Sequence, residues 1–359
     1  MALDAAFWRG KRVLLTGNTG FKGSWAALWL KRLGARVFGY ALTPDTEPAL
    51  FLAARVGTVE RNTVGDVRDA AAVDAAFALH SPQIVIHMAA QPLVRVAYEQ
   101  PRETYSTNVA GTAVVLDAAR RCDSVRAVVV VTSDKCYDLR GVDRARAEDD
   151  VLGGAEPYAA SKAGAELVTA ALRSSLFAAQ TLIRPCGLAT ARAGNTLGGG
   201  DWARDRLMPD LIASFIEGVA APVRNPGAVR PWQHILDALR GYFVLAQRLW
   251  HEPAAFSEAW NFGPPASHER PVRWVADEAS RLFERGARWR TDETRHPAEA
   301  SALRLDSSKA LRRLEWTAHL DLTQAIEWTV NWYRAYYDGA SARALVEADL
   351  ERYGALVPA

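Results

Sequence analysis

The chain has 359 residues, of which 49% are hydrophobic and 23% are charged, and its formal net charge is +2. This composition fits a folded globular protein, and the length suits one large α/β unit or two lobes. The small net charge, without a lysine-rich or arginine-rich block, gives no support to a nucleic-acid or anionic-membrane partner.

Cysteine and histidine are scattered along the chain. Cys122, Cys136 and Cys186 form no CxxC motif, and the seven histidines form no HxxxH pair. We therefore expect a reducing compartment and no metal site. The N-terminal residues contain no long apolar segment before a small-residue cleavage site, and no run of 18 apolar residues occurs, so we expect a cytoplasmic protein outside the membrane.

The first half of the chain alternates strand-like and helix-like patterns. Strand patterns occupy Arg12–Leu15, 35–42, Gln83–Ala90 and Arg126–Ser133. Helical patterns occupy 24–34, 69–80 and 108–122. The last two strand segments are almost continuously apolar, as in central parallel strands that are covered on both faces. This alternation predicts an α/β fold with a Rossmann-type, doubly wound parallel sheet.

After about residue 190 the chain becomes rich in Gly, Pro, Arg and Trp. This texture predicts a smaller, loop-rich α/β lobe that binds a polar substrate. We expect residues 1–185, with a return at about 232–260, to form the sheet domain. Residues 186–231 and 261–359 are expected to form the substrate-binding lobe.

The segment "TGNTGFKG" places Gly17, Gly20 and Gly23 at GxxGxxG spacing between the first strand and the first helix. Glycines there let the backbone turn tightly and approach a diphosphate at the helix N-terminus. A structural turn is the alternative, but the position at the start of a strand–helix series favours a dinucleotide site. The predicted cofactor contacts are Gly17, Gly20, Phe21, Lys22, Gly23, Asp66, Val67, Ala89, Ala90, Tyr158 and Lys162.

The acidic residue that usually binds the ribose 2′-hydroxyl is missing, because no Asp or Glu follows the second strand before Asp45. This feature alone leaves NAD and NADP open. Asp66, in "VGDVRD", is a candidate for the adenine amino group, and a turn or a helix cap is the equally plausible alternative.

The segment "PYAASK" places Tyr158 and Lys162 four residues apart, and hence on one face of a helix. A tyrosine that acts as a base near pH 7 needs a pKa about three units below its usual value, which corresponds to about 4 kcal/mol. A nearby lysine and an oxidised nicotinamide would supply the positive field. Together with Ser133, at the end of the four-valine strand, the pair resembles the catalytic set of the extended short-chain dehydrogenases/reductases.

Asp134 and Lys135 follow that serine directly, in "TSDKCYD". An acid and a base at this place are typical of sugar-nucleotide 4,6-dehydratases, which eliminate water, and the Asp-Lys version resembles CDP-glucose 4,6-dehydratases. The resemblance is close over about residues 7–265 and loose beyond them. Its segments are "FWRGKRVLLTGNTGFKGSW", "HMAAQPLVRVAYEQPRETYSTNVAGT", "ARAGNTLGGGDWARDRLMPD", "RNPGAVRPWQH", "WNFGP" and "LDSSKALRRLEW".

The resemblance implies a redox-neutral mechanism with NAD as a recycled hydride carrier. Tyr158 would take the C4 hydroxyl proton, Lys135 the C5 proton, and Asp134 would protonate the departing C6 hydroxyl. The two last roles are interchangeable at this stage. The alternative for Asp134 and Lys135 is a surface ion pair, because adjacent residues of a strand point to opposite faces.

Arginine side chains suit the two phosphates of CDP-glucose. The predicted substrate contacts are Gln91, Arg95, Asn195, Arg204, Arg206, Arg230, Trp232 and His234. Packing is an equal alternative for Trp232. Asn108 is expected to support the site through a backbone contact, with a helix cap as the alternative.

Two rival functions stay open: an epimerase or plain dehydrogenase that acts on another nucleotide sugar, and a non-enzymatic NAD-sensing protein on the same fold. The resemblance also implies a homo-oligomer, a dimer or a tetramer, that pairs through two helices near 105–121 and 158–175.

Overall fold

The structure is a computed structural model that describes residues 3–58, 61–140, 144–178, 184–294 and 302–357. Within these residues, seven parallel strands form the central sheet in the order β11–β6–β5–β4–β1–β2–β3. The strands are β1 (Arg12–Thr16), β2 (Arg36–Ala41), β3 (Arg61–Val64), β4 (Ile84–His87), β5 (Ala127–Val131), β6 (Gly187–Ala193) and β11 (Ala259–Phe262). The predicted Rossmann-type sheet is confirmed.

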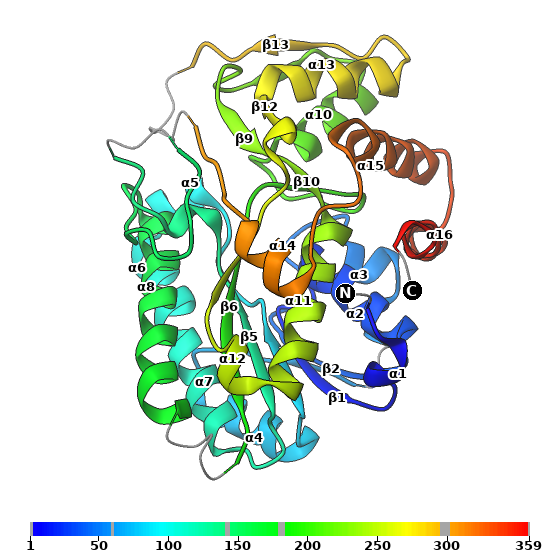
Figure 1. Ribbon diagram of the computed structural model, residues 1–359. Coiled ribbons are helices and arrows are strands. Elements are labelled where there is room, and N and C mark those ends of the chain that lie inside the picture. The colour runs from blue at the N-terminus through cyan, green and yellow to red at the C-terminus, as the bar shows by residue number, and fades with distance from the viewer. Residues whose placement is uncertain (1–2, 59–60, 141–143, 179–183, 295–301, 358–359) are drawn as a thin grey trace.

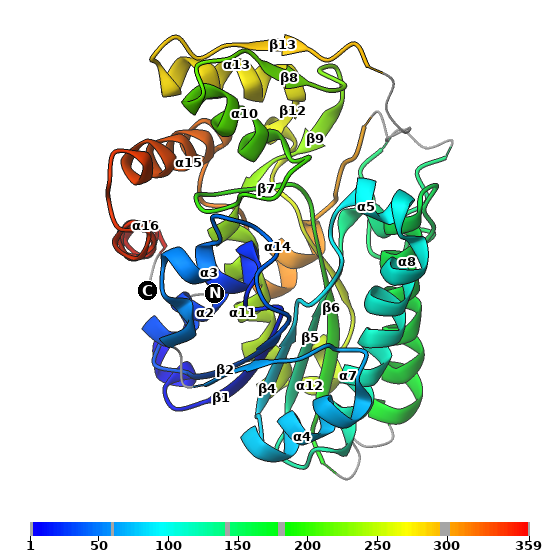
Figure 2. The same ribbon diagram turned by 180° about the vertical axis from the view of Figure 1, so that it is seen from behind.

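Helices cover both faces of this sheet, so its central strands are buried on both sides. In β5, Val128 and Val130 face one apolar cluster, and Val129 and Val131 face the other. The first cluster lies under α4 (Ala70–His80) and α7 (Gly111–Arg121), beside α8 (Pro157–Leu172). The second lies under α2 (Phe21–Arg32) and α11 (Ile235–His251), as Figures 1 and 2 show. Burial on both faces explains the unbroken valine run.

A second group of elements lies beyond the carboxyl ends of the strands, at the top of Figure 1. Its short paired strands are β7 (Thr196–Leu197) with β10 (Gln233–His234), β8 (Ala221–Val223) with β13 (Trp289–Thr291), and β9 (Val229–Pro231) with β12 (Glu269–Pro271). Its packed helices are α10 (Leu207–Ile216), α13 (Val272–Phe283) and α15 (Leu322–Tyr337). Ligands of doubly wound folds bind at this edge of the sheet.

The remaining described helices are short or peripheral. They are α1 (Ala5–Trp8), α3 (Leu50–Ala53), α5 (Val94–Glu99), α6 (Pro101–Tyr105), α12 (Pro253–Phe256), α14 (Ser308–Leu314) and α16 (Ala342–Leu356). Short 3₁₀ segments are η1 (Val56–Thr58), η3 (Asp134–Cys136) and η5 (Ala266–His268), and π-helical segments are η2 (Ser106–Ala110) and η4 (Arg173–Phe177). None of the described helices is long and apolar enough to cross a membrane.

Two segments lie differently from the expected division of the chain. β6 begins after residue 185 but belongs to the central sheet, because it pairs in register with β5. The C-terminal helix α16 packs against α2 and α3 on the sheet side, although it was expected in the substrate-binding lobe. The division into two lobes otherwise stays a prediction.

Candidate active site

The glycine turn after β1 is tightly closed. Gly17 has φ of +76°, and a Cβ atom there would lie 2.7 Å from the Ala89 backbone nitrogen. A Cβ atom on Gly23 would lie 2.1 Å from the Gly17 carbonyl oxygen. Only glycine fits these two positions without movement of the backbone.

Gly20 precedes the first turn of α2 and leaves the N-terminus of this helix without a side-chain cap. A Cβ atom on Gly20 would meet no atom closer than 3.6 Å. The helix therefore presents backbone N–H groups at an open, exposed cradle, which fits the diphosphate of a dinucleotide. Phe21 and Lys22 form the first turn of the helix, and Ala89 and Ala90 follow the neighbouring strand β4.

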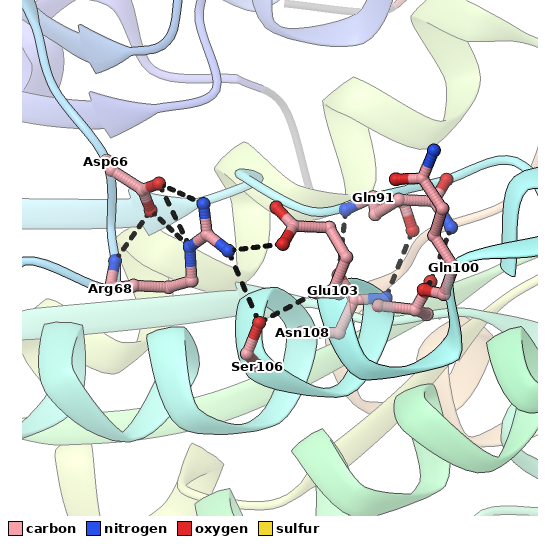
Figure 3. Close-up of polar contacts among 8 residues, drawn as sticks. Asp66, Arg68, Gln91, Gln100, Glu103, Ser106 and Asn108 are labelled. Carbon is pink, nitrogen blue, oxygen red and sulfur yellow. Dashed lines mark hydrogen bonds and ion pairs between the residues drawn. The ribbon is translucent and has the colours of Figure 1, made fainter.

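Asp66 follows β3 and is bound by its neighbour Arg68 (Figure 3). Its carboxylate accepts hydrogen bonds from the Arg68 backbone N–H at 2.9 Å and from the guanidinium, which also pairs with Glu103. Hydrogen bonds from Arg68 hold the pKa of Asp66 below its usual value. The Asp66 carboxylate thus stabilises the turn after β3, and Asp69 is the residue that caps α4. The contact of Asp66 with adenine stays a prediction. The adjacent Val67 is buried.

A pocket of about 250 Å³ lies between the carboxyl edge of the sheet and the second group of elements. Ser133, Asp134, Lys135 and Tyr158 line it together. Its other polar and charged lining residues are Lys22, Arg95, Thr132, Asn195, Thr196, Asp201, Asp205, Arg206, Asp210, Arg224, Asn225 and Arg230.

The segment after β5 turns both charged side chains toward this pocket. Ser133 is extended and precedes η3, so Asp134 and Lys135 no longer alternate as strand residues do. The Ser133 hydroxyl donates to Asp134 Oδ1 at 3.0 Å and accepts from the Lys135 backbone N–H. Asp134 is 2% exposed, which excludes an exposed surface ion pair.

The other oxygen of Asp134, Oδ2, is buried and has no hydrogen-bond partner among the described residues. A buried acceptor of this kind costs free energy unless a ligand satisfies it. Burial raises the pKa of Asp134 and outweighs the nearby charges of Lys135, Arg230 and Lys22. The carboxyl group is therefore prepared to carry a proton.

Tyr158 and Lys162 lie one turn apart at the start of α8, and both are nearly buried. Burial raises the pKa of Tyr158 to about 12, so its lowering by Lys162 together with an oxidised nicotinamide stays a prediction. The loss of water around the buried phenol opposes the effect of a positive field. Burial lowers the pKa of Lys162 to about 8, and its ammonium donates to the Val131 carbonyl at 3.3 Å.

Asn108 lies in the π-helical segment η2 and makes the expected backbone contact (Figure 3). Its amide accepts from the Gln91 backbone N–H at 2.8 Å and donates to the Gln91 carbonyl and to Ser161 in α8. The Gln91 side chain bonds to Leu93 and Thr104 and does not line the pocket. The Gln91 side chain therefore stabilises the loop after β4, since its polar atoms are already hydrogen-bonded to Leu93 and Thr104.

Of the predicted substrate residues, Arg95, Asn195, Arg206, Arg230 and Trp232 line the pocket. Arg204 is exposed and lies outside the lining.

His234 is also outside the lining, with no exposed surface. Its Nδ1 atom caps the first turn of α11, its ring packs edge-on against Trp328, and burial lowers its pKa to about 3. This histidine is a neutral packing residue and not a substrate ligand.

Several charged residues of the pocket were missed or placed elsewhere by sequence reasoning. Lys22 lines this pocket in addition to following the glycine turn, and burial lowers its pKa to about 8. Asp205 joins Arg95 and Arg224, each at 2.9 Å. The sequence does not predict these ion pairs, because Arg95, Asp205 and Arg224 lie in separate segments that only the folded chain brings together. No group of His, Cys, Asp or Glu residues in the described part of the chain could hold a metal ion.

A family model described as GDP-mannose 4,6 dehydratase matches residues 14–329 of the chain. The chain is 46% identical to CDP-glucose 4,6-dehydratase of Salmonella typhimurium, over 98% of each sequence. The chain belongs to the nucleotide-sugar 4,6-dehydratase family. Another member, dTDP-glucose 4,6-dehydratase of Shigella flexneri, is 25% identical over 75% of this chain and 77% of its own.

Solved structures of this dehydratase family share the fold. A double mutant of DesIV, the dTDP-glucose 4,6-dehydratase of Streptomyces venezuelae, with NAD bound, has a TM-score of 0.76 at 25% identity and covers 90% of this chain and 97% of its own. The dTDP-glucose 4,6-dehydratase of Bacillus anthracis, in complex with NAD, has a TM-score of 0.73 at 19% identity, with coverages of 92% and 98%.

Proposed function

We propose that the chain is a hydro-lyase that converts CDP-glucose to CDP-4-dehydro-6-deoxy-glucose and water, with NAD as its resident cofactor. The observation that carries the proposal is the shared pocket of Ser133, Asp134, Lys135 and Tyr158. The tyrosine that would assist oxidation and the acid–base pair for elimination thus face one sugar-sized space. The 46% identity to a CDP-glucose 4,6-dehydratase supports the choice of reaction and of base.

The glycine turn and the open N-terminus of α2 would hold the cofactor diphosphate. When bound, NAD⁺ supplies a hydride acceptor for C4 of the glucose and later the donor for C6. The lower pKa that Tyr158 needs as a base depends on positive charge near its phenol, from Lys162 and from the oxidised nicotinamide.

The pocket residues would act in sequence. Tyr158 would remove the proton of the C4 hydroxyl as the C4 hydride is lost to the bound cofactor, which makes C4 a ketone and the C5 hydrogen acidic. Lys135 removes the C5 proton, and Asp134 donates its proton to the C6 hydroxyl, which leaves as water. Lys135 returns its proton to C5, and the proton held by Tyr158 restores Asp134 through solvent, so the protein ends as it began.

The positive side chains of the pocket would hold the substrate diphosphate. Lys22, Arg206 and Arg230 line the same pocket as Asp134 and Tyr158. Arg206 also pairs with Asp201 at 2.8 Å, which fixes its guanidinium at the pocket wall. Asn195 and Trp232 complete this part of the lining.

The proposal includes a cytoplasmic homodimer. The two segments predicted to pair, 105–121 and 158–175, pack together through α7 and α8 and leave Tyr105 and Leu167 40% and 59% exposed. Pairing of two copies over this surface would cover both side chains, and sedimentation velocity would measure it.

The deciding experiment incubates the purified protein with CDP-glucose and NAD⁺ and follows the alkali-induced absorbance of a 4-keto-6-deoxy sugar. Parallel reactions contain dTDP-glucose and GDP-mannose. We expect product from CDP-glucose at the highest rate. Turnover without a 4-keto-6-deoxy product would instead indicate an epimerase or a dehydrogenase, and NAD binding without turnover would indicate a sensor.

A further inference from the structure

Glu166 is a buried carboxylate that the proposed reaction does not use. Tyr158, Lys162 and Glu166 follow one another at intervals of four residues in α8, and therefore lie on one face of the helix. All three are nearly inaccessible to solvent, and Glu166 is 2% exposed. A charged group in such a place needs compensation.

Three side chains from the central strands hold this carboxylate. Thr132, directly after β5, donates to Glu166 Oε1 at 2.5 Å. Thr190 and Arg192, both in β6, donate to Oε2 at 2.8 and 2.7 Å. Burial raises the pKa of Glu166, but the hydrogen bonds and the charge of Arg192 outweigh it and leave this pKa below its usual value. Glu166 is therefore ionised at neutral pH.

Arg192 connects this carboxylate to the segment that carries the acid–base pair. Its Nη1 atom donates to the Tyr137 hydroxyl at 2.7 Å, and its guanidinium lies 4.9 Å from the centre of the Tyr137 ring. Tyr137 directly follows η3, and its hydroxyl donates to Asn261 in β11. The Glu166–Arg192 pair thus joins α8 and the end of η3 to the same strands.

The charge of Glu166 acts on Lys162. Burial, the largest effect, lowers the Lys162 pKa, and the Glu166 carboxylate opposes this change. Other described titratable groups around Lys162 and Glu166 are Cys136 beside η3, His87 in β4, Lys22 in α2, Tyr158 in α8, and Arg192 in β6, the cation that pairs with Glu166 at 2.7 Å. Burial keeps Cys136, His87 and Tyr158 uncharged at neutral pH, and Lys22 is a cation. Among these groups, Glu166 supplies the negative charge.

We propose that Glu166 is a positioning residue whose negative charge keeps the Lys162 side chain in its ammonium form. The functional meaning rests on the proposed function, in which this ammonium assists Tyr158. Without the carboxylate, burial would lower the Lys162 pKa further, so a larger share of the side chain would be neutral at pH 7 and the positive field that Tyr158 requires would weaken.

The test measures the protonation of Lys162 without any substrate. The chain has six lysines, so ¹³Cε-lysine NMR gives a simple spectrum, in which the Lys162 signal is assigned by its loss in Lys162→Met. In Glu166→Gln we expect the titration midpoint of Lys162 to fall by about one pH unit or more. Glu166→Asp, which keeps the charge, should restore most of the midpoint. Thr190→Val is the matched control, because it removes one hydrogen bond to Glu166 and no charge.

An unchanged Lys162 midpoint in Glu166→Gln would overturn the proposal. If that variant does not fold, the double variant Glu166→Leu/Arg192→Leu removes the buried anion together with its cation, and should show a smaller fall in the same direction, because the lost charge of Arg192 opposed that of Glu166. With CDP-glucose as substrate, kcat of Glu166→Gln at pH 7 should drop about tenfold, and the alkaline limb of its pH profile should move to lower pH. Loss of packing alone would lower activity without moving that limb. The NMR measurement needs no turnover, so it tests Glu166 even if the proposed function is wrong. Failure of the proposed function would be seen separately, as the absence of product with the wild-type protein.

Discussion

The side-chain nitrogen of Lys135, Nζ, lies 5.7 Å from the centre of the Tyr158 ring. One residue follows the central strand β5 and the other begins α8, so the fold brings together two segments that are apart in the sequence. An amine this close to the phenol can reach the carbon next to the one that Tyr158 would help to oxidise. Oxidation and elimination can therefore occur on one bound sugar.

Replacement of Asp134 by Asn should stop the elimination and spare the oxidation. Asn keeps the size of the buried side chain but cannot donate a proton to the leaving hydroxyl. We expect formation of the 4-keto-6-deoxy product to fall about 10²–10⁴-fold. Absorbance at the NADH band should still appear when CDP-glucose is added, and its absence would contradict the assigned role.

Replacement of Lys135 by Met should block removal of the C5 proton. In D₂O the wild-type protein should place deuterium at C5 of the product, and the variant should do so only at its lower rate of turnover, because the base that removes the C5 proton is gone. Turnover should fall about 10²–10⁴-fold. Lys31→Met, at an exposed position of α2, is the matched control and should keep normal turnover. Intact dehydration in Lys135→Met would remove the lysine from the mechanism.

The pH dependence should report the proton on Asp134. Burial raises the pKa of Asp134, and the group acts as an acid only below that pKa. The kcat/KM for CDP-glucose should therefore decrease as pH rises through this raised pKa, and the limb should disappear in Asp134→Asn. A limb that persists unchanged in the variant would belong to another group.

Much of this fold is readable from the sequence. The continuous apolar runs around Val128–Val131 and Ile84–Ile86 predict strands that are covered on both faces. Such strands belong in the centre of a parallel sheet with helices on both sides. The glycine spacing and the tyrosine–lysine spacing are local, so they predict local structure. These features explain why the sheet, the glycine turn after β1 and the helix that carries Tyr158 and Lys162 agree with expectation.

The substrate side is less predictable, because its residues meet only through long loops. Arg204 and Arg206 are chemically equal in the sequence, and the turn at Asp205 directs only Arg206 into the pocket. His234 looks like a polar ligand, yet its position at the N-terminus of the buried helix α11 makes it a cap. The Tyr158 pKa depends on burial, which spacing does not reveal.

The two arginines offer a test of the substrate pocket. Arg206→Ala removes a guanidinium from the pocket wall and should raise KM for CDP-glucose about 10–100-fold, because charge-assisted hydrogen bonds to phosphate contribute about 1.5–3 kcal/mol each. Arg204→Ala removes an exposed side chain two residues away and should leave KM unchanged. Initial rates over a range of CDP-glucose concentrations measure both. Equal effects would mean that the pocket does not hold the diphosphate as proposed.

The glycine turn offers a test that separates folding from cofactor binding. In Gly23→Ala the new methyl group would overlap the Gly17 carbonyl oxygen, so we expect the free energy of unfolding to fall by about 1–3 kcal/mol together with weak NAD binding. In Gly20→Ala the methyl group has open space, so the protein should keep its stability. It should nevertheless bind NAD at least about tenfold more weakly, since the methyl group occupies the cradle at the N-terminus of α2. Urea unfolding and calorimetric titration with NAD⁺ measure the two effects, and normal NAD affinity in Gly20→Ala would place the diphosphate elsewhere.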